Sequence, residues 1–141
     1  MKSIIIVSHG TIAKGIYQAT NMIYGDINNV NYLCLEQTMG IDFFRQKLDQ
    51  LIESVKDADQ IVVLADLKGG SPYTSAVTLL SEKGLLQKSK IIAGLNLPMI
   101  LSVLFIENEI GDKEIKEIIN EAKEGIIEFE IPVEGNENDD L

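Results

Sequence analysis

Short, unbroken apolar runs alternate with longer segments of helical periodicity along the chain. Four runs predict strands buried on both faces, as in parallel sheets, at residues 4–7, 30–35, 61–65 and 90–95. Apolar residues recur at helical spacing after each of them, which predicts helices near 12–25, 44–55, 72–83, 98–106 and 112–123. This alternation favours right-handed crossovers and an α/β fold: a doubly wound sheet of four parallel strands, with helices on both faces.

The ends of the predicted elements carry their own signals. We expect Thr11 to cap the first helix, and Ser71 to cap the third with Pro72 as its first helical residue. Residues 126–133, "IIEFEIPV", alternate weakly, as a final strand would. Residues 134–141 are polar, acidic and aperiodic, which predicts a disordered tail after a single domain of residues 1–133.

Composition narrows the function classes. The net charge of −10 argues against binding nucleic acid or anionic membranes. The single cysteine excludes an internal disulfide and Cys-rich zinc sites. The opening "MKSIIIV" is too short an apolar run for a secretory signal, and the longest apolar stretch, 97–106, is about half of what a bilayer requires. We therefore expect a cytoplasmic protein.

Two candidate catalytic residues follow neighbouring strands of the expected sheet. In doubly wound folds ligands bind beyond the carboxyl ends of the strands, where the strand order reverses. His9, the only histidine, follows the first strand and precedes a helix start, and Asp66 follows the third strand. In the common order 2-1-3-4 these strands are adjacent, so Asp66 can fix one imidazole nitrogen and leave the other as a nucleophile. The plainer interpretations are a surface histidine in a turn and a solvated loop carboxylate.

The segment from Gly69 to Pro72 suits both a turn and an anion site. Its glycines fit a strand-to-helix connection, and a helix start presents amides and the Ser71 hydroxyl to a phosphate. We include the amides of Gly10 and Gly70 among the candidate phosphate contacts, and interpret Lys68 as a solvated lysine. The sequence has neither GxxxxGK[ST] nor GxGxxG after the first strand, and its single histidine and cysteine leave only carboxylates for a metal.

Three stretches together resemble the IIA domain of the mannose-family sugar phosphotransferase system: "IIVSHGTIAKGI", "VVLADLKGGSPYTSA" and "IIAGLNLPMILSVL". The resemblance implies that His9 accepts a phosphoryl group from phospho-HPr and donates it to a histidine of the IIB subunit. That subunit phosphorylates sugar entering through the IIC/IID membrane complex. The orienting carboxylate falls on Asp66 and the phosphate-contacting serine on Ser71. A phosphoimidazole is already an activated donor, so no metal or other cofactor is required.

The resemblance also implies a homodimer in which a fifth, antiparallel strand is exchanged, a role that falls on residues 126–133. Lys68 departs from the family pattern, where an aromatic residue is frequent. The lack of a following linker and IIB domain indicates a free-standing IIA subunit. Two alternatives stay open: the related phosphotransferase subunit that feeds dihydroxyacetone kinase, and a non-catalytic regulatory or binding module. The transported sugar cannot be identified from the sequence.

Overall fold

The computed structural model describes residues 1–133 of the chain, so the predicted acidic tail lies outside the described residues. Within them, strands and helices alternate as the apolar periodicity predicts. The elements are β1 (Lys2–His9), α1 (Ile12–Tyr24), β2 (Val30–Leu35), α2 (Ile41–Val55), β3 (Gln60–Ala65), α3 (Ser71–Glu82), the 3₁₀ helix η1 (Leu86–Lys88), β4 (Ser89–Ala93), α4 (Leu97–Phe105) and α5 (Asp112–Glu124).

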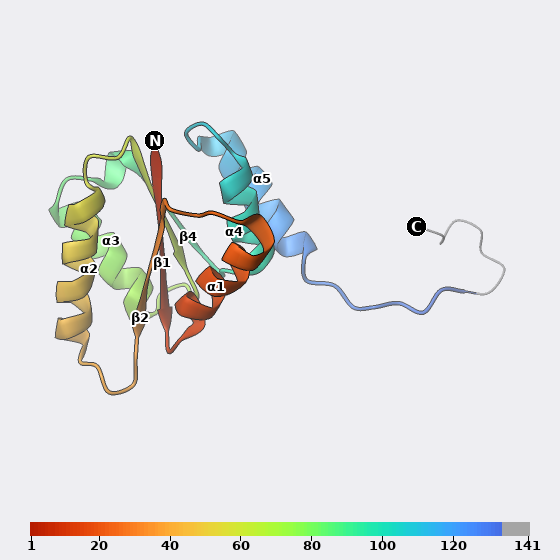
Figure 1. The fold of residues 1–141 in the computed structure, drawn as a ribbon, viewed down its shortest axis with the longest axis horizontal. Helices are drawn as coiled ribbons and strands as arrows, with labels where there is room; N and C mark the ends of the chain where they lie inside the picture. The colour runs from red at the N-terminus through yellow and green to blue at the C-terminus, as the bar shows by residue number, and fades with distance from the viewer. Residues whose placement is uncertain (134–141) are drawn as a thin grey trace.

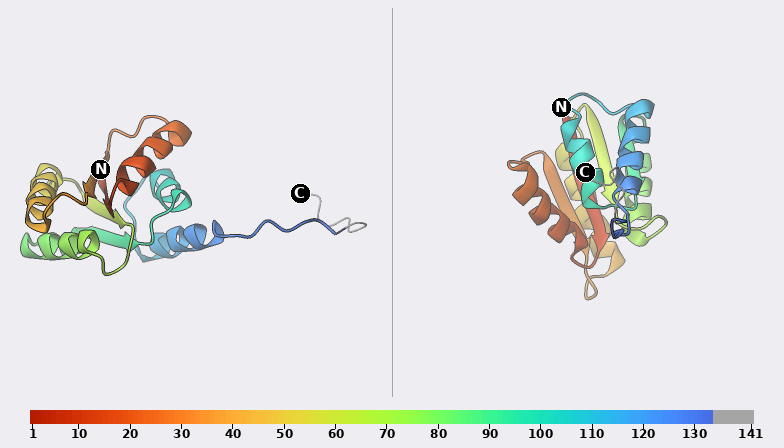
Figure 2. Two further views of the ribbon diagram at one scale, coloured as in Figure 1. Left: turned by 90° about the horizontal axis from the view of Figure 1, so that it is seen from below. Right: turned by 90° about the vertical axis from the view of Figure 1, so that its right-hand side faces the viewer.

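The strands form one parallel sheet in the order β2-β1-β3-β4, which confirms the predicted topology. Figure 1 shows α2 and α3 on one face of the sheet and α1, α4 and α5 on the other, and both views of Figure 2 agree. The chain passes from β1 to β2 on one side and then crosses to β3 on the other. The strand order therefore reverses between β1 and β3.

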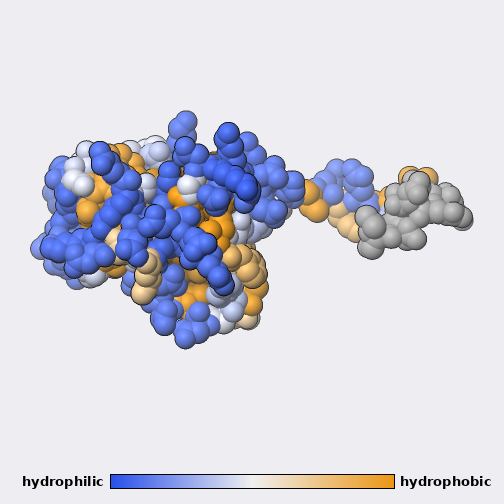
Figure 3. Space-filling model, turned by 90° about the horizontal axis from the view of Figure 1, so that it is seen from above, coloured by the Kyte–Doolittle hydropathy of each residue, from blue (hydrophilic) through white to orange (hydrophobic). Residues whose placement is uncertain are grey.

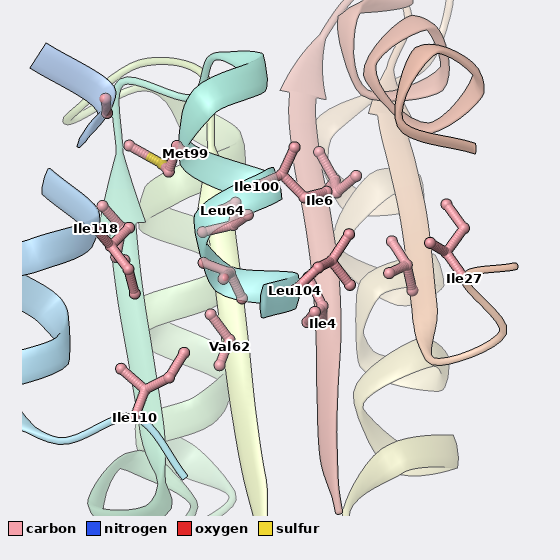
Figure 4. Close-up of a cluster of buried hydrophobic side chains, with 14 of the residues drawn as sticks. Ile4, Ile6, Ile27, Val62, Leu64, Met99, Ile100, Leu104, Ile110 and Ile118 are labelled. Carbon is pink, nitrogen blue, oxygen red and sulfur yellow. The ribbon is translucent and has the colours of Figure 1, made fainter. Parts of the chain in front are cut away.

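The central strands supply apolar residues to two separate cores. Ile4 and Ile6 of β1 pack with α4 and α5, whereas Ile5 and Val7 point to the opposite face and pack with α2 and α3. Figure 4 shows the first core, between the sheet and the helices α4 and α5. All four side chains are fully buried, which explains why an unbroken apolar run, rather than an alternating one, marks this strand.

Three strands begin earlier than their apolar runs predict, and buried polar residues extend two of them, β1 and β3, whereas β4 starts at Ser89 and ends at Ala93, before the predicted residue 95. Lys2 starts β1, and its ammonium donates to the carbonyl oxygens of Ile106 and Asn108, the latter at 3.1 Å. Burial lowers the pKa of Lys2 from its ordinary value. Gln60 starts β3 and is 6% exposed, with its amide bonded to both backbone groups of Ile110. These partners lie far away in the sequence, so no local pattern reveals them.

The helix caps differ from the predicted ones. Gly70, not Ser71, is the N-cap of α3, so Ser71 is its first helical residue; the predicted cap was wrong by one position. Thr11 is the N-cap of α1, but its side chain makes no capping bond. The buried hydroxyl of Ser8, in β1, instead accepts a hydrogen bond from the Ala13 N–H at 2.7 Å. The strand therefore fixes the start of the helix that follows it.

Residues 126–133 leave the end of α5 as an extended segment that projects from the body of the molecule (Figures 1 and 3). The segment is not a strand within the single chain. Figure 3 shows apolar atoms along it, and its apolar side chains are 70–83% exposed: Ile126, Ile127, Phe129, Ile131 and Val133. Its exchange across a dimer stays a prediction. Among the described residues, no helix is long and apolar enough to cross a membrane.

Candidate functional site

The sheet places His9 and Asp66 side by side at its carboxyl edge. Val7 of β1 is in register with Ala65 of β3, and His9 and Asp66 follow within two residues of that pair. The Asp66 N–H donates to the Val7 carbonyl at 3.3 Å, which extends the ladder past the end of β3. Both side chains are thus held by the backbone at the point where the strand order reverses, as expected for a ligand site.

One carboxylate oxygen of Asp66 holds both the backbone and the ring of His9. Oδ2 accepts the His9 N–H at 3.0 Å and lies 2.9 Å from Nδ1. A carboxylate only accepts hydrogen bonds, so this contact favours the tautomer with its proton on Nδ1 and a free electron pair on Nε2. The His9 side chain is 44% exposed and that of Asp66 only 11%. A shielded carboxylate therefore orients an accessible imidazole.

Ser71 shares an open depression of about 490 Å³ with His9. Ser71 is exposed at the first turn of α3, where amides have no carbonyl of their own helix to bond and the helix dipole favours an anion. The depression is also lined by Gly10, Leu35, Glu36, Gln37, Met39 and Ile41. The depression therefore brings together three of the predicted site residues: His9, Gly10 and Ser71.

The amides of Gly10 and Gly70, two of the predicted phosphate contacts, are already engaged. The Gly10 N–H donates to the Leu35 carbonyl at 2.8 Å, and the Gly70 N–H to the Leu67 carbonyl at 3.1 Å. Gly10 has a φ of +54°, a left-handed conformation that favours glycine in the turn from β1 into α1. Phosphate binding through either amide would require an existing hydrogen bond to break, so Ser71 is the better-placed donor.

Exposed apolar side chains lie close in sequence to the site residues or line the depression at His9, and they were not among the residues predicted from the sequence. Leu67, directly after Asp66, is 59% exposed; Ile12 and Ile41, at the starts of α1 and α2, are 50% and 42% exposed. Helical periodicity does not reveal Ile12 and Ile41, because an apolar residue in the first turn of a helix fits the same pattern as the residues that face the core. Leu67 could have been found, since it is the apolar residue in the polar loop "DLKGGS".

The fold and the site define a class: a small α/β domain with an oriented histidine at the switch point of a parallel sheet, beside the start of a helix. The chain belongs to the family described as the PTS system fructose IIA component, whose family model matches residues 3–123. It is a IIA component of the sugar phosphotransferase system, a family of phosphotransferases.

Curated relatives and solved structures agree with this assignment. The chain is 28% identical to the fructose-specific EIIA component of Bacillus subtilis over 123 residues, covering 87% of this chain and 80% of the relative. It is 29% identical to the sorbose-specific EIIA component of Lacticaseibacillus casei, covering 86% and 85%. The crystal structure of phosphotransferase system component EIIA from Streptococcus agalactiae superposes with a TM-score of 0.79 at 31% identity, covering 91% of this chain and 97% of that one.

Proposed function

We propose that the protein is a phosphoryl carrier in which Nε2 of His9 accepts the phosphoryl group of phospho-HPr and passes it to a histidine of a IIB subunit. One observation carries the proposal: Asp66 Oδ2 holds both the backbone N–H and Nδ1 of a half-exposed histidine. This arrangement orients the ring, defines its tautomer and leaves one nitrogen accessible.

In the first transfer, the electron pair of Nε2 attacks the phosphorus atom of the donor phosphohistidine. The bond from phosphorus to the donor nitrogen breaks, and that nitrogen keeps the electron pair. The His9 ring then carries a phosphoryl group on Nε2 and its original proton on Nδ1. Asp66 stabilises the positive charge of that ring through the 2.9 Å contact. The second transfer repeats the same exchange with the IIB histidine as the attacking group.

Ser71 supports the phosphoryl group in this proposal. Phosphoryl transfer mainly requires positioning and stabilisation of charge on the equatorial oxygens. The hydroxyl of Ser71, in the first turn of α3, supplies a donor at the same depression as His9. The reaction exchanges one phosphorus–nitrogen bond for another, so we assign no metal or cofactor to it.

The exposed apolar side chains around His9 fit a carrier that two proteins visit in turn. Ile41 lines the depression at His9, and Leu67 and Ile12 lie close in sequence to Asp66 and His9, so these exposed side chains offer apolar contact area near the site. In our proposal HPr and the IIB subunit use this surface in the cytoplasm, and the IIB subunit passes the group to sugar at the IIC/IID membrane complex.

We also propose that residues 126–133 pair with β4 of a second copy. A groove of about 720 Å³ runs along the outer side of β4, and Lys90 and Lys123 are among its lining residues. The groove is lined by three lysines and two aspartates, and one of the aspartates, Asp112, pairs with Lys90. Glu128 and Glu130, which lie between the apolar side chains of the segment, complement this small excess of positive charge. Deleting residues 126–133 should convert a dimer into a monomer in sedimentation experiments; a full-length monomer at micromolar concentration contradicts the exchange.

The test of the proposed function uses labelled phosphoenolpyruvate, enzyme I and HPr. The protein should take up label that is stable in alkali and labile in acid, whereas His9→Ala should take up none. Asp57→Asn serves as the control, because Asp57 is exposed between α2 and β3, at the opposite edge of the sheet. Transfer onward to a IIB subunit supports the proposal. Transfer to dihydroxyacetone kinase instead, or no labelling of the wild type, refutes it.

A further inference from the structure

Gly70 stands directly against the imidazole of His9, and its backbone gives no reason for a glycine. Its φ of −72° and ψ of 164° are an extended conformation that any residue adopts. The preceding Gly69 differs, since its φ of +80° lies in the left-handed region. The requirement for glycine at position 70 must therefore come from what surrounds it.

The surroundings leave no room for a side chain. A Cβ atom built on Gly70 would lie 2.6 Å from Cε1 of His9 and 3.3 Å from Nε2. Ordinary van der Waals contact between carbon atoms begins at about 3.5 Å, so the first of these distances is a clash. The ring edge with Cε1 and Nε2 thus occupies the space that a side chain at position 70 would need, while the other nitrogen, Nδ1, contacts Asp66.

We propose that Gly70 is a positioning residue for His9: by lacking a side chain, it lets the ring lie where Nδ1 bonds Asp66 and Nε2 stays free. This role is distinct from phosphate binding, since the Gly70 N–H is engaged with Leu67. The effect of Gly70 on phosphoryl transfer rests on the proposed function, whereas its effect on the position of the His9 ring is independent of that function.

A methyl group at position 70 displaces the ring rather than the fold. The atom it meets is the far end of a side chain that is 44% exposed, so the ring can turn toward solvent. Turning breaks the 2.9 Å contact between Nδ1 and Asp66 and removes the preference for one tautomer. Gly70→Ala should therefore fold normally and carry a misplaced imidazole.

A matched control exists in the same molecule. Gly40 is the N-cap of α2, with a φ of −71° and a ψ of 152°, and a Cβ there meets nothing within 4 Å. Gly40→Ala therefore makes the same chemical change, at the same helix position and backbone conformation, without touching His9. It measures what an alanine cap itself does to stability.

The experiment is ¹⁵N NMR of the unphosphorylated protein, in which the single histidine gives unambiguous ring signals. In the wild type and in Gly40→Ala, the neutral ring should show a protonated Nδ1 and an unprotonated Nε2. In Gly70→Ala both signals should move toward the average of the two tautomers. Denaturation midpoints of the two variants should agree, and transfer from phospho-HPr should be slowed about 10- to 100-fold in Gly70→Ala, as for a misplaced reacting group.

Any other result contradicts either the positioning role of Gly70 or the proposed phosphoryl-carrier function. Unchanged ring signals in Gly70→Ala overturn the positioning role, whether or not transfer slows. Unfolding of Gly70→Ala alone also overturns it, because the ring was expected to absorb the contact. Mixed tautomers in a protein whose wild type accepts no phosphoryl group leave the positioning role intact and refute the proposed function.

Discussion

The substitution Asp66→Asn tests how much the carboxylate charge contributes to phosphoryl transfer. Asparagine keeps the size of the side chain and an oxygen that can accept from the His9 N–H and Nδ1–H, but it loses the negative charge. Hydrogen bonds to a charged group contribute about 1.5–3 kcal/mol. The His9 side chain is 44% exposed, so solvent screening reduces the expected loss to about 1–2 kcal/mol. At about 1.4 kcal/mol per factor of ten, transfer should slow about 5- to 30-fold.

The assay is rapid-quench transfer of label from phospho-HPr, together with the fraction of protein phosphorylated at equilibrium. Both should fall if, as proposed, Asp66 stabilises the charged phosphorylated ring and the transition state that leads to it. Asp57→Asn controls for the change in net charge, and a denaturation curve verifies the fold. A transfer rate in Asp66→Asn indistinguishable from the wild type would show that the negative charge of Asp66 does not contribute to transfer, and that a neutral acceptor beside His9 is enough.

Two further predictions concern stability. Hydrogen bonds from Lys56 and Lys83 lower the pKa of Glu53 to about 2, so its stabilisation is present above the ordinary value of 4.5 and is lost as pH falls toward 2. The melting temperature of Glu53→Gln should lie below that of the wild type at pH 7. The difference should shrink as the pH falls from about 4.5 toward 2, and a difference that does not change with pH contradicts this prediction. Gln60→Ala leaves the buried N–H and C=O of Ile110 without their 2.8 Å partners, which should cost about 2–4 kcal/mol in urea denaturation. A loss below about 1 kcal/mol would show that water replaces the amide.

Much of the fold could be predicted because its information is local. An unbroken apolar run such as residues 61–65 indicates a strand covered on both faces, and the structure confirms this for β3. The common strand order of doubly wound sheets, 2-1-3-4, predicts that His9 and Asp66 lie close together. Their roles in transfer remain predictions.

The parts that could not be predicted depend on distant partners. Asn96 caps α4 through the Met99 N–H and also donates to the carbonyl of Ala122 in α5. The sequence shows a polar residue before Pro98, but nothing near it indicates the contact with α5. The steric role of Gly70 is of the same kind, since "GGSP" is equally typical of an ordinary strand-to-helix turn. Only the packed structure distinguishes a glycine that a turn requires from one that a neighbouring side chain requires.

In this site the imidazole of His9 is accessible, and the carboxylate that orients it lies beside it and is less exposed. The proposed carrier role requires His9 to offer one nitrogen to two large partners, so the ring cannot be buried, yet an exposed imidazole would sample several rotamers. Here the ring is half exposed, the shielded Asp66 oxygen holds it at Nδ1, and the missing side chain of Gly70 leaves the space that its Cε1 occupies. Both residues follow the end of β3, which the Asp66 N–H ties to β1 at Val7. The sheet therefore orients the His9 ring through Asp66, so Nε2 can stay exposed to solvent while the ring keeps one orientation.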